Sequence, residues 1–306
     1  MAEKDIAEKI LEAYNEVFAD IVNVLLFHGE DVIKPDELVE QAPRAAYKAD
    51  GRLREIERDV AKRWTKQNIH IACIGLENQT TVDRDMPLRV IGYDGAEYRW
   101  QLSQNSPERY PVATLVLYFD YEKHWNGPLN LLDCFPVPEE FKPYVNDYKV
   151  NLFEIAYLTD EQVNLFKSDF RAVAEYFTQM QRNRDYNPEP RTLVHVQEVL
   201  QLLSIMTGDH RFEEVFASGT EGGPENMCEV LSKIEDRGIM KGRAEGRAEG
   251  RAEGRAEGRA EGRAEGRAEG RAEGISEMAS ILRRLGVNEE QIAEAARISK
   301  ERRSSL

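Results

Sequence analysis

The order of apolar and polar residues predicts a helix near the start of the chain, followed by strands. Apolar residues recur at steps of three and four between residues 5 and 27, as on one face of an amphipathic helix. Residues 28–57 carry Gly and Pro at several points and are expected to form a loop. Residues 58–64 and the apolar run 69–77 are then expected to pair as neighbouring strands.

Helix and strand patterns alternate beyond this pair. A helix is predicted over residues 86–104, and further strands over residues 110–119 and 147–156. This order predicts an α/β domain with a mixed sheet over residues 1–158. From Thr159 the pattern becomes helical, beginning with the Thr-x-x-Gln spacing of a capping box, and residues 159–241 are expected to form a helical extension.

Residues 242–274 are eight Gly-Arg-Ala-Glu units closed by Gly274. Each four-residue step advances about 400° around a helix, so no apolar stripe persists along the tract. Arg and Glu stand two residues apart, where helical side chains do not face each other, and each Gly costs about 1 kcal/mol relative to Ala. We expect a weak, exposed helix or a flexible spacer. Because every Arg is matched by a Glu, the tract is a poor basic tail for nucleic acid.

Residues 275–306 return to an amphipathic pattern that predicts a helical hairpin. Ile275, Met278 and Leu282 lie on one helical face, Gly286 ends the first helix and Asn288 caps the second. The same pattern is typical of the first two helices of a helix-turn-helix, although the remaining residues are short for a recognition helix. The hairpin interpretation is favoured, and with it a homo-oligomer formed through the C-terminal helices.

Charge and cysteine content restrict the function and the compartment. The formal net charge of −15 argues against broad nonspecific attraction to nucleic acid, so DNA binding would need a local basic surface or a metal that offsets acidic groups. The three cysteines are far apart and fit neither a disulfide framework nor a zinc site, which favours a reducing cytoplasm. No stretch reaches the ~20 apolar residues of a membrane span, so no membrane partner is expected.

Two carboxylates are expected to meet where the central pair of strands ends. Asp59 precedes the first strand, and Glu77, Asn78 and Gln79 end the second. Because side chains alternate along a strand, Glu77 and Gln79 should point to one face and Asn78 to the other. Two carboxylates at one sheet edge provide hard oxygen ligands for Mg²⁺ or Mn²⁺. A polar strand terminus without catalytic function is the alternative interpretation of the same residues.

This spacing resembles the core of the PD-(D/E)XK nucleases, in which an acid on one strand meets an acid-x-basic triplet on the next. The wider chain resembles the recombination-promoting nuclease (Rpn) family, whose members are also described as transposase-like. The segments that carry the resemblance cover most of residues 14–180: FADIVNVLLFHGEDVIKP, RDVAKRW, IGLENQ, MPLRVIGYD, YPVATLVLYFDYEKHW and YKVNLFEIAYLTDEQVNLFKSDFR. Two positions depart from the superfamily pattern. Arg58 stands where Pro usually precedes the acid, and Gln79 stands where Lys is usual, although Gln resembles the Rpn family's own pattern.

The resemblance implies a restriction-endonuclease-like core and a Mg²⁺- or Mn²⁺-dependent DNA endonuclease associated with recombination or transposition. Asp59 and Glu77 would hold the ion, with the backbone carbonyl of Asn78 as a third ligand. Gln79 would orient the attacking water or the scissile phosphate. In the superfamily the first helix often brings one more acid to the metal, and Asp20 is the candidate here. Its alternative roles are an exposed helix acid or a cap to a neighbouring loop.

Basic residues beside these acids are expected to contact DNA phosphates. Residues 50–66 form the densest basic cluster outside the repeat, and the candidates are Arg58, Lys62 and Arg63 from this cluster and Arg89 from the following helix. A solvated surface of mixed charge is the alternative. The competing function for the whole chain is a noncatalytic DNA-binding or assembly protein that keeps the nuclease fold. The presence of Asp59, Glu77 and Gln79 argues against it, whereas the acidic balance and the absent Lys keep it open.

Overall fold

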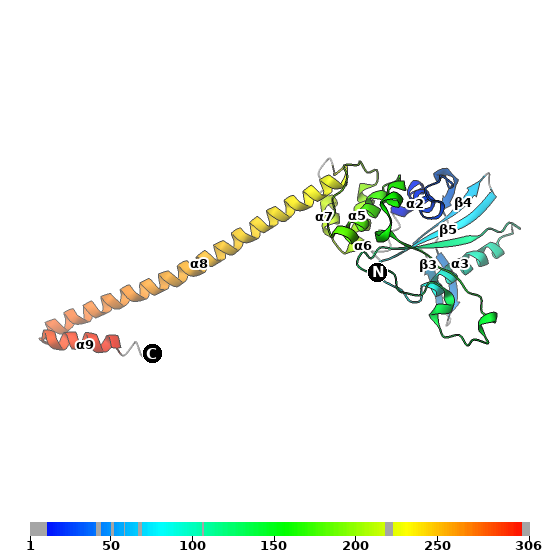
Figure 1. Ribbon diagram of the computed structural model, residues 1–306. Helices are drawn as coiled ribbons and strands as arrows, with labels where there is room; N and C mark the ends of the chain where they lie inside the picture. Colours follow the sequence, from blue (N-terminus) through cyan, green and yellow to red (C-terminus); the bar gives the residue numbers. More distant parts are fainter. Residues whose placement is uncertain are drawn as a thin grey trace. The chain divides into compact units, whose positions relative to one another are not determined.

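The computed structural model divides the chain into two compact units, residues 1–235 and 236–306. It describes residues 11–40, 44–49, 52–57, 59–66, 69–105, 107–217 and 223–301, and of these only the backbone at 44–49, 52–57, 69–71, 216–217 and 299–301. The first unit contains a mixed sheet with helices, and the second contains a long helix and a short one (Figure 1).

The main sheet of the first unit has five strands in the order β1-β4-β5-β6-β7. The strands are β1 (Leu38–Glu40), β4 (Val60–Lys66), β5 (Ile69–Gln79), β6 (Val112–Tyr118) and β7 (Asn151–Glu154). β1, β4 and β5 are antiparallel neighbours, whereas β5, β6 and β7 are parallel. The predicted mixed α/β sheet is therefore confirmed, and so is the pairing of the strand that follows Asp59 with the strand that carries Glu77.

A second, two-stranded sheet occupies a region that the sequence pattern had assigned to a loop. β2 (Arg44–Ala49) and β3 (Arg52–Glu57) pair antiparallel, with Ala49 opposite Arg52. The loop prediction for residues 28–57 was wrong here and at β1. The overlooked signal is the Asp50-Gly51 dipeptide between two short runs, which favours the tight turn of a hairpin. Pro35 begins a single 3₁₀ turn, η1 (Pro35–Glu37), directly before β1.

Helices cover one face of the main sheet and build its larger core (Figure 1). They are α2 (Asn15–Phe27), α4 (Asp160–Leu165), α5 (Phe170–Asn183), α6 (Val196–Thr207) and α7 (Arg211–Ala217), with the 3₁₀ turn η4 (Ile155–Tyr157). Alternate residues of the strands, including Ile74, Leu76 and Leu117, point into this core. The helices after residue 158 share one core with the sheet, so that position marks a change in secondary structure within one compact unit. The capping box of Thr159 and Gln162 is present as expected.

The opposite face of the sheet packs against α3 (Met86–Ser103), which starts seven residues after β5 ends. Met86 and Val90 contact Val116 of β6 and Val150, all of them buried. The two 3₁₀ turns η2 (Leu131–Cys134) and η3 (Lys142–Tyr144) lie in the connection from β6 to β7. Because α3 follows β5 directly, its first turn lies beside the end of the strand that carries Glu77.

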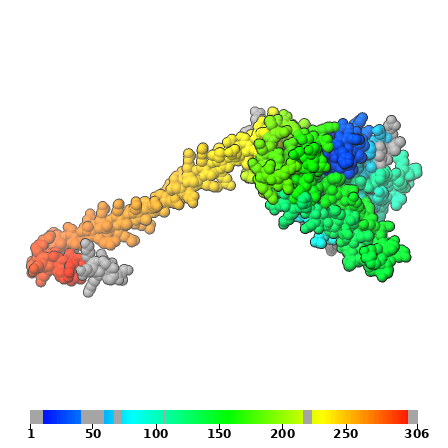
Figure 2. Space-filling view, in the orientation of Figure 1, coloured from blue at the N-terminus to red at the C-terminus, as the bar shows by residue number. Residues whose placement is uncertain are grey.

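The second unit is built from α8 (Met227–Arg284), which begins in the first unit, and α9 (Glu289–Glu301). The repeat is helical within α8, and its residues are exposed throughout, as Figure 2 shows for the yellow and orange part of the helix. Gly286 adopts φ +84° after α8, and the side chain of Asn288 accepts a hydrogen bond from the Gln291 amide at 2.9 Å, so the predicted stop and cap are both confirmed. In the described part of the chain, no helix combines the length and apolar character needed to cross a membrane.

Candidate functional site

Asp59 and the triplet Glu77-Asn78-Gln79 lie together at one end of the main sheet. β4 and β5 are antiparallel with Val60 opposite Leu76, which places Asp59 beside Glu77. The Asn78 amide donates a hydrogen bond to Asp59 Oδ2 at 2.7 Å. The main chain of the triplet therefore anchors the Asp59 carboxylate, and the expected meeting of the two acidic segments is present in the structure.

Glu77 faces α3, and three donors converge on its Oε1 atom. Arg89 Nη2 forms a short ion pair with this oxygen, Gln79 Nε2 donates to it at 3.2 Å, and the Tyr93 hydroxyl lies at 3.4 Å. Glu77 is buried, with 1 % of its surface exposed. Burial acts to lower the pKa of Arg89, but the charge of Glu77 and the interactions with Tyr93 and Asp83 together outweigh this and leave the pKa above its usual value. The prediction that Glu77 and Gln79 share one face is confirmed.

Asn78 points to the opposite face, where it meets an acid that the sequence did not reveal. Asn78 Nδ2 donates to Glu12 Oε2 at 2.9 Å, and Glu12 is fully buried. Burial raises the pKa of Glu12 to about 8; the hydrogen bond from Asn78 opposes the rise, and the charges of Asp59 and Glu77 add to it. Within the described residues, Glu12 Oε1 and Asn78 Oδ1 are buried oxygens with no hydrogen-bond partner.

The pattern of apolar residues along the predicted helix 5–27 could not show that Glu12 lies at this site. The chain leaves helical geometry at Tyr14, with φ −69° and ψ 127°, before α2 begins. The faces of α2 therefore do not extend back to residue 12, and the contact with Asn78 joins positions 66 residues apart. No local sequence signal pairs these two residues.

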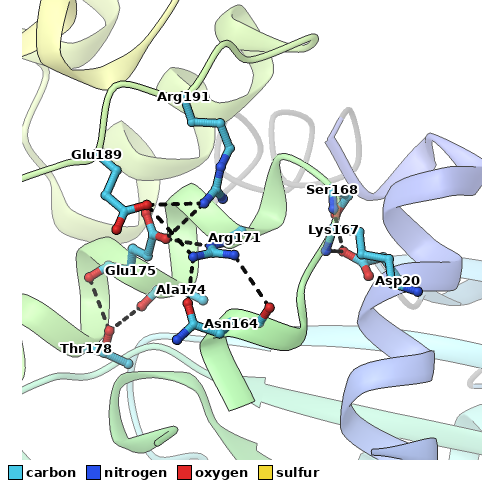
Figure 3. Close-up of polar contacts among 10 residues, drawn as sticks. All are labelled: Asp20, Asn164, Lys167, Ser168, Arg171, Ala174, Glu175, Thr178, Glu189 and Arg191. Atoms are coloured by element: carbon cyan, nitrogen blue, oxygen red, sulfur yellow. Dashed lines mark hydrogen bonds and ion pairs between the residues drawn. The ribbon is translucent and has the colours of Figure 1, made fainter. Parts of the chain in front are cut away.

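Asp20, the acid expected at the metal, has a structural role at another place (Figure 3). Its Oδ2 accepts hydrogen bonds from the backbone amides of Lys167 and Ser168, at 2.9 and 2.7 Å. It also lines a cavity of about 560 Å³ beside α2 whose lining includes neither Asp59 nor Glu77. The structure thus shows the alternative role, a cap to a neighbouring loop, and brings Glu12 rather than Asp20 to the two acids.

The basic residues expected at DNA divide into different environments. Lys62 is buried, with its ammonium 2.6 Å from both the Ala13 carbonyl oxygen and Asn15 Oδ1, so the prediction of a phosphate contact by Lys62 is wrong. It holds the junction before α2 instead. The Arg63 guanidinium lies over the Trp100 ring, 5.1 Å from its centroid. Arg58 lies outside the described residues, and Arg89 reaches the strand end as expected.

The oxygen atoms at this end of the sheet are of the kind that a hard divalent cation prefers. Mg²⁺ commonly uses one or two carboxylates and keeps several water ligands, so Asp59, Glu77 and a backbone carbonyl are sufficient in kind. The pKa of Glu12 is raised mainly by burial, and the charges of Asp59 and Glu77 add to the rise, so these two acids lie close enough to act on Glu12. Within the residues described, no group of three His, Cys, Asp or Glu side chains is close enough to enclose a metal by itself. The residues therefore fit an ion that is completed by water and substrate.

Comparison with known proteins adds the family. Residues 50–204, half of the chain, match the family model described as "Putative transposase, YhgA-like". The chain belongs to this family. The matched range of the YhgA-like family includes Asp59, the triplet on β5 and Arg89, whereas Glu12 and the repeat lie outside it. No curated protein and no solved structure matches the chain. The family points to a transposition-related function with DNA as the partner.

Proposed function

We propose that the first unit is a metal-dependent DNA endonuclease that hydrolyses phosphodiester bonds in DNA recombination or transposition. The observation that carries this proposal is the placement of Asp59 and buried Glu77 at one end of the sheet, joined through the Asn78 amide. A PD-(D/E)XK-type core is part of the proposal. The mixed sheet and the family membership support it.

Asp59 and Glu77 would hold Mg²⁺ or Mn²⁺, with the backbone carbonyl of Asn78 as a further ligand. Such an ion supplies Lewis acidity at the phosphoryl oxygen and lowers the pKa of a bound water. A cation here would offset electrostatic repulsion. A phosphodiester that approaches this end of the sheet meets the carboxylates of Asp59 and Glu77, of which Glu77 is buried, and like charges repel strongly where water is scarce.

Gln79 would act through a hydrogen bond, because an amide cannot remove a proton at neutral pH. Its Nε2 donates to Glu77 Oε1 at 3.2 Å, which fixes the amide plane and directs the amide at the same end of the sheet. The side-chain oxygen of Gln79 can then accept a hydrogen bond from an attacking water. Fixed polar groups of this kind typically change turnover by about 10²–10³.

One observation favours a second candidate, a noncatalytic DNA-binding protein with the same fold. Glu77 Oε1 already accepts hydrogen bonds from Arg89, Gln79 and Tyr93, so side chains of the protein itself occupy this oxygen. In that case Asp59 and Glu77 would serve only to anchor the strand end and α3. The two candidates differ in one measurable respect, since only the endonuclease requires a divalent ion for covalent change in DNA.

The test is cleavage of supercoiled plasmid by the full chain with Mg²⁺, with Mn²⁺ and with a chelator. We expect nicking that depends on metal and is lost in Asp59→Ala. Asp236→Ala removes an exposed carboxylate from α8 and is the matched control, expected to cleave like the wild type. Plasmid that stays intact with every ion, while the folded protein still binds DNA, would support the noncatalytic candidate.

A further inference from the structure

The distribution of positive charge around the two acids singles out Arg89. Of the candidate basic residues that the structure describes, Lys62 is buried against Ala13 and Asn15, and Arg63 lies over Trp100. Gln79 carries no charge. Arg89 alone of these candidates contacts Glu77, and it does so with a guanidinium that stays charged at any physiological pH.

Arg89 is held from several sides in one orientation. It lies in the first turn of α3, where Nη2 donates to Glu77 and Nη1 donates to Asp83 Oδ2 at 3.0 Å. The Tyr93 hydroxyl, one turn later, accepts from Nε at 3.2 Å and from Nη2 at 2.9 Å. These contacts fix the guanidinium plane with little remaining rotamer freedom.

The same guanidinium remains open to solvent on another side. The Arg89 side chain is 39 % exposed, whereas that of its partner Glu77 is 2 % exposed. Its contacts with Glu77 and Asp83 leave one N–H of Nη1 directed elsewhere. A ligand that reaches this end of the sheet therefore meets Arg89 at its surface, with Glu77 beneath it. A guanidinium N–H that is directed to solvent in this way suits an oxygen of a phosphodiester.

Arg89 and Gln79 converge on one atom, Glu77 Oε1, from two different elements. A cation carried by residue 79 would therefore stand where the Arg89 guanidinium already reaches. The strand supplies a neutral amide at this point and the helix supplies the charge. This convergence makes the two positions exchangeable in principle, which is a property that mutagenesis can test.

We propose that Arg89 is the phosphate-binding side chain of this site, and that it supplies from α3 the positive charge that Gln79 does not supply from β5. This inference rests on the proposed function, because the ligand is the phosphodiester beside the ion held by Asp59 and Glu77. Glu77 and Tyr93 position the guanidinium, and its exposed edge contacts a nonbridging phosphate oxygen. Recognition through the phosphate carries no base information, so this contact serves all DNA sequences alike.

The binding test uses a short fluorescent DNA duplex with Ca²⁺ over a range of salt concentrations. Removing one phosphate contact should reduce the slope of log affinity against log salt by about 1. We expect this for Arg89→Gln, which keeps a hydrogen-bonding group near Glu77 and Tyr93 but loses the charge. Arg99→Ala removes the same charge from an exposed position later in α3 and should leave the slope unchanged.

The cleavage test adds the exchange of positions. Arg89→Gln should slow single-turnover cleavage by about 10²–10³, as expected for the loss of one fixed donor at the phosphate. The double variant Arg89→Gln/Gln79→Lys should cleave at least about tenfold faster than Arg89→Gln alone. Arg89→Lys should fall between the wild type and Arg89→Gln, because it keeps the charge without the fork. Circular dichroism and thermal unfolding confirm that each variant folds.

The outcomes separate this inference from the proposed function. If the wild type binds the duplex but cleaves DNA with none of the ions tested, the endonuclease proposal is refuted. The salt slopes still decide the role of Arg89 in that case. Equal slopes for wild type and Arg89→Gln, or wild-type cleavage by Arg89→Gln, refute phosphate binding by Arg89. If Arg89 has only a structural role, Arg89→Gln should leave the salt slope unchanged and raise the metal concentration needed for cleavage. Adding Gln79→Lys to that variant should then restore no activity. If the wild type neither binds nor cleaves DNA, both proposals are wrong.

Discussion

Replacing Glu12 with Gln should stabilise the first unit at pH 8 but have little effect at pH 5. Glu12 is fully buried, and its carboxyl group lies near Asp59 and Glu77, so its ionised form is disfavoured in the folded state. Gln has almost the same shape and no charge. It can still accept the hydrogen bond from Asn78, and its NH₂ group occupies the place of a buried oxygen that has no partner within the described residues.

The size of the effect follows from linkage between proton binding and folding. The pKa of Glu12 rises from 4.5 to about 8 on folding, mainly through burial. A carboxyl group with a raised pKa favours folding below about pH 4.5, and that contribution is lost as the pH rises towards 8. With about 1.36 kcal/mol for each pKa unit, the loss between pH 5 and pH 8 is roughly 3.5 kcal/mol. Glu12→Gln removes this loss, so its advantage over the wild type should grow by that amount.

The assay is urea unfolding of wild type and Glu12→Gln at pH 5, 6.5 and 8 with a chelator present. All three tryptophans lie in the first unit, so their fluorescence reports its unfolding. Glu214→Gln, at an exposed position of α7, is the control and should show no pH-dependent difference. An advantage of Glu12→Gln that changes by less than about 1 kcal/mol across this range would show that Glu12 is solvated, and would refute the reasoning.

Four further predictions concern Asp20, Gln79, the repeat and the C-terminal hairpin. Asp20→Ala should lower the free energy of unfolding in urea by about 1–3 kcal/mol, because the amides of Lys167 and Ser168 lose their acceptor. It should not change the metal dependence of cleavage, and a changed metal dependence would show that Asp20 belongs to the metal site. Gln79→Ala should lower single-turnover cleavage by about 10²–10³ with metal affinity nearly unchanged, and wild-type rates at every metal concentration would reduce Gln79 to a strand-end residue. Deleting residues 242–273 should leave metal-dependent cleavage intact, and loss of cleavage in a folded deletion variant would contradict this. Met278→Glu should reduce self-association in sedimentation experiments, because it places a charge on the exposed apolar face of the hairpin through which two copies are expected to join. An unchanged mass for Met278→Glu would contradict this expectation.

Local patterns determined those features of the protein whose causes lie within a few residues. The pairing of β4 with β5, the helix after β5 and the opposite faces of Glu77 and Asn78 all follow from strand alternation and short connections. The capping box at Thr159 and the cap at Asn288 are likewise set by neighbouring side chains. The hairpin β2–β3 was predictable in the same way from Asp50-Gly51, and was overlooked.

The tertiary structure alone decided which side chains at the site meet. Glu12 and Asn78 are 66 residues apart, Asp20 and Lys167 are 147 apart, and Lys62 and Ala13 are 49 apart. Glu12, Asp20 and Lys62 read as solvated positions in the sequence, and all three are buried in the structure. A buried charge must find a partner or change its protonation, so the partner set by the fold decides its role. For this reason the sequence indicated Asp59, Glu77 and Arg89, while the fold assigned the roles of Glu12, Asp20 and Lys62.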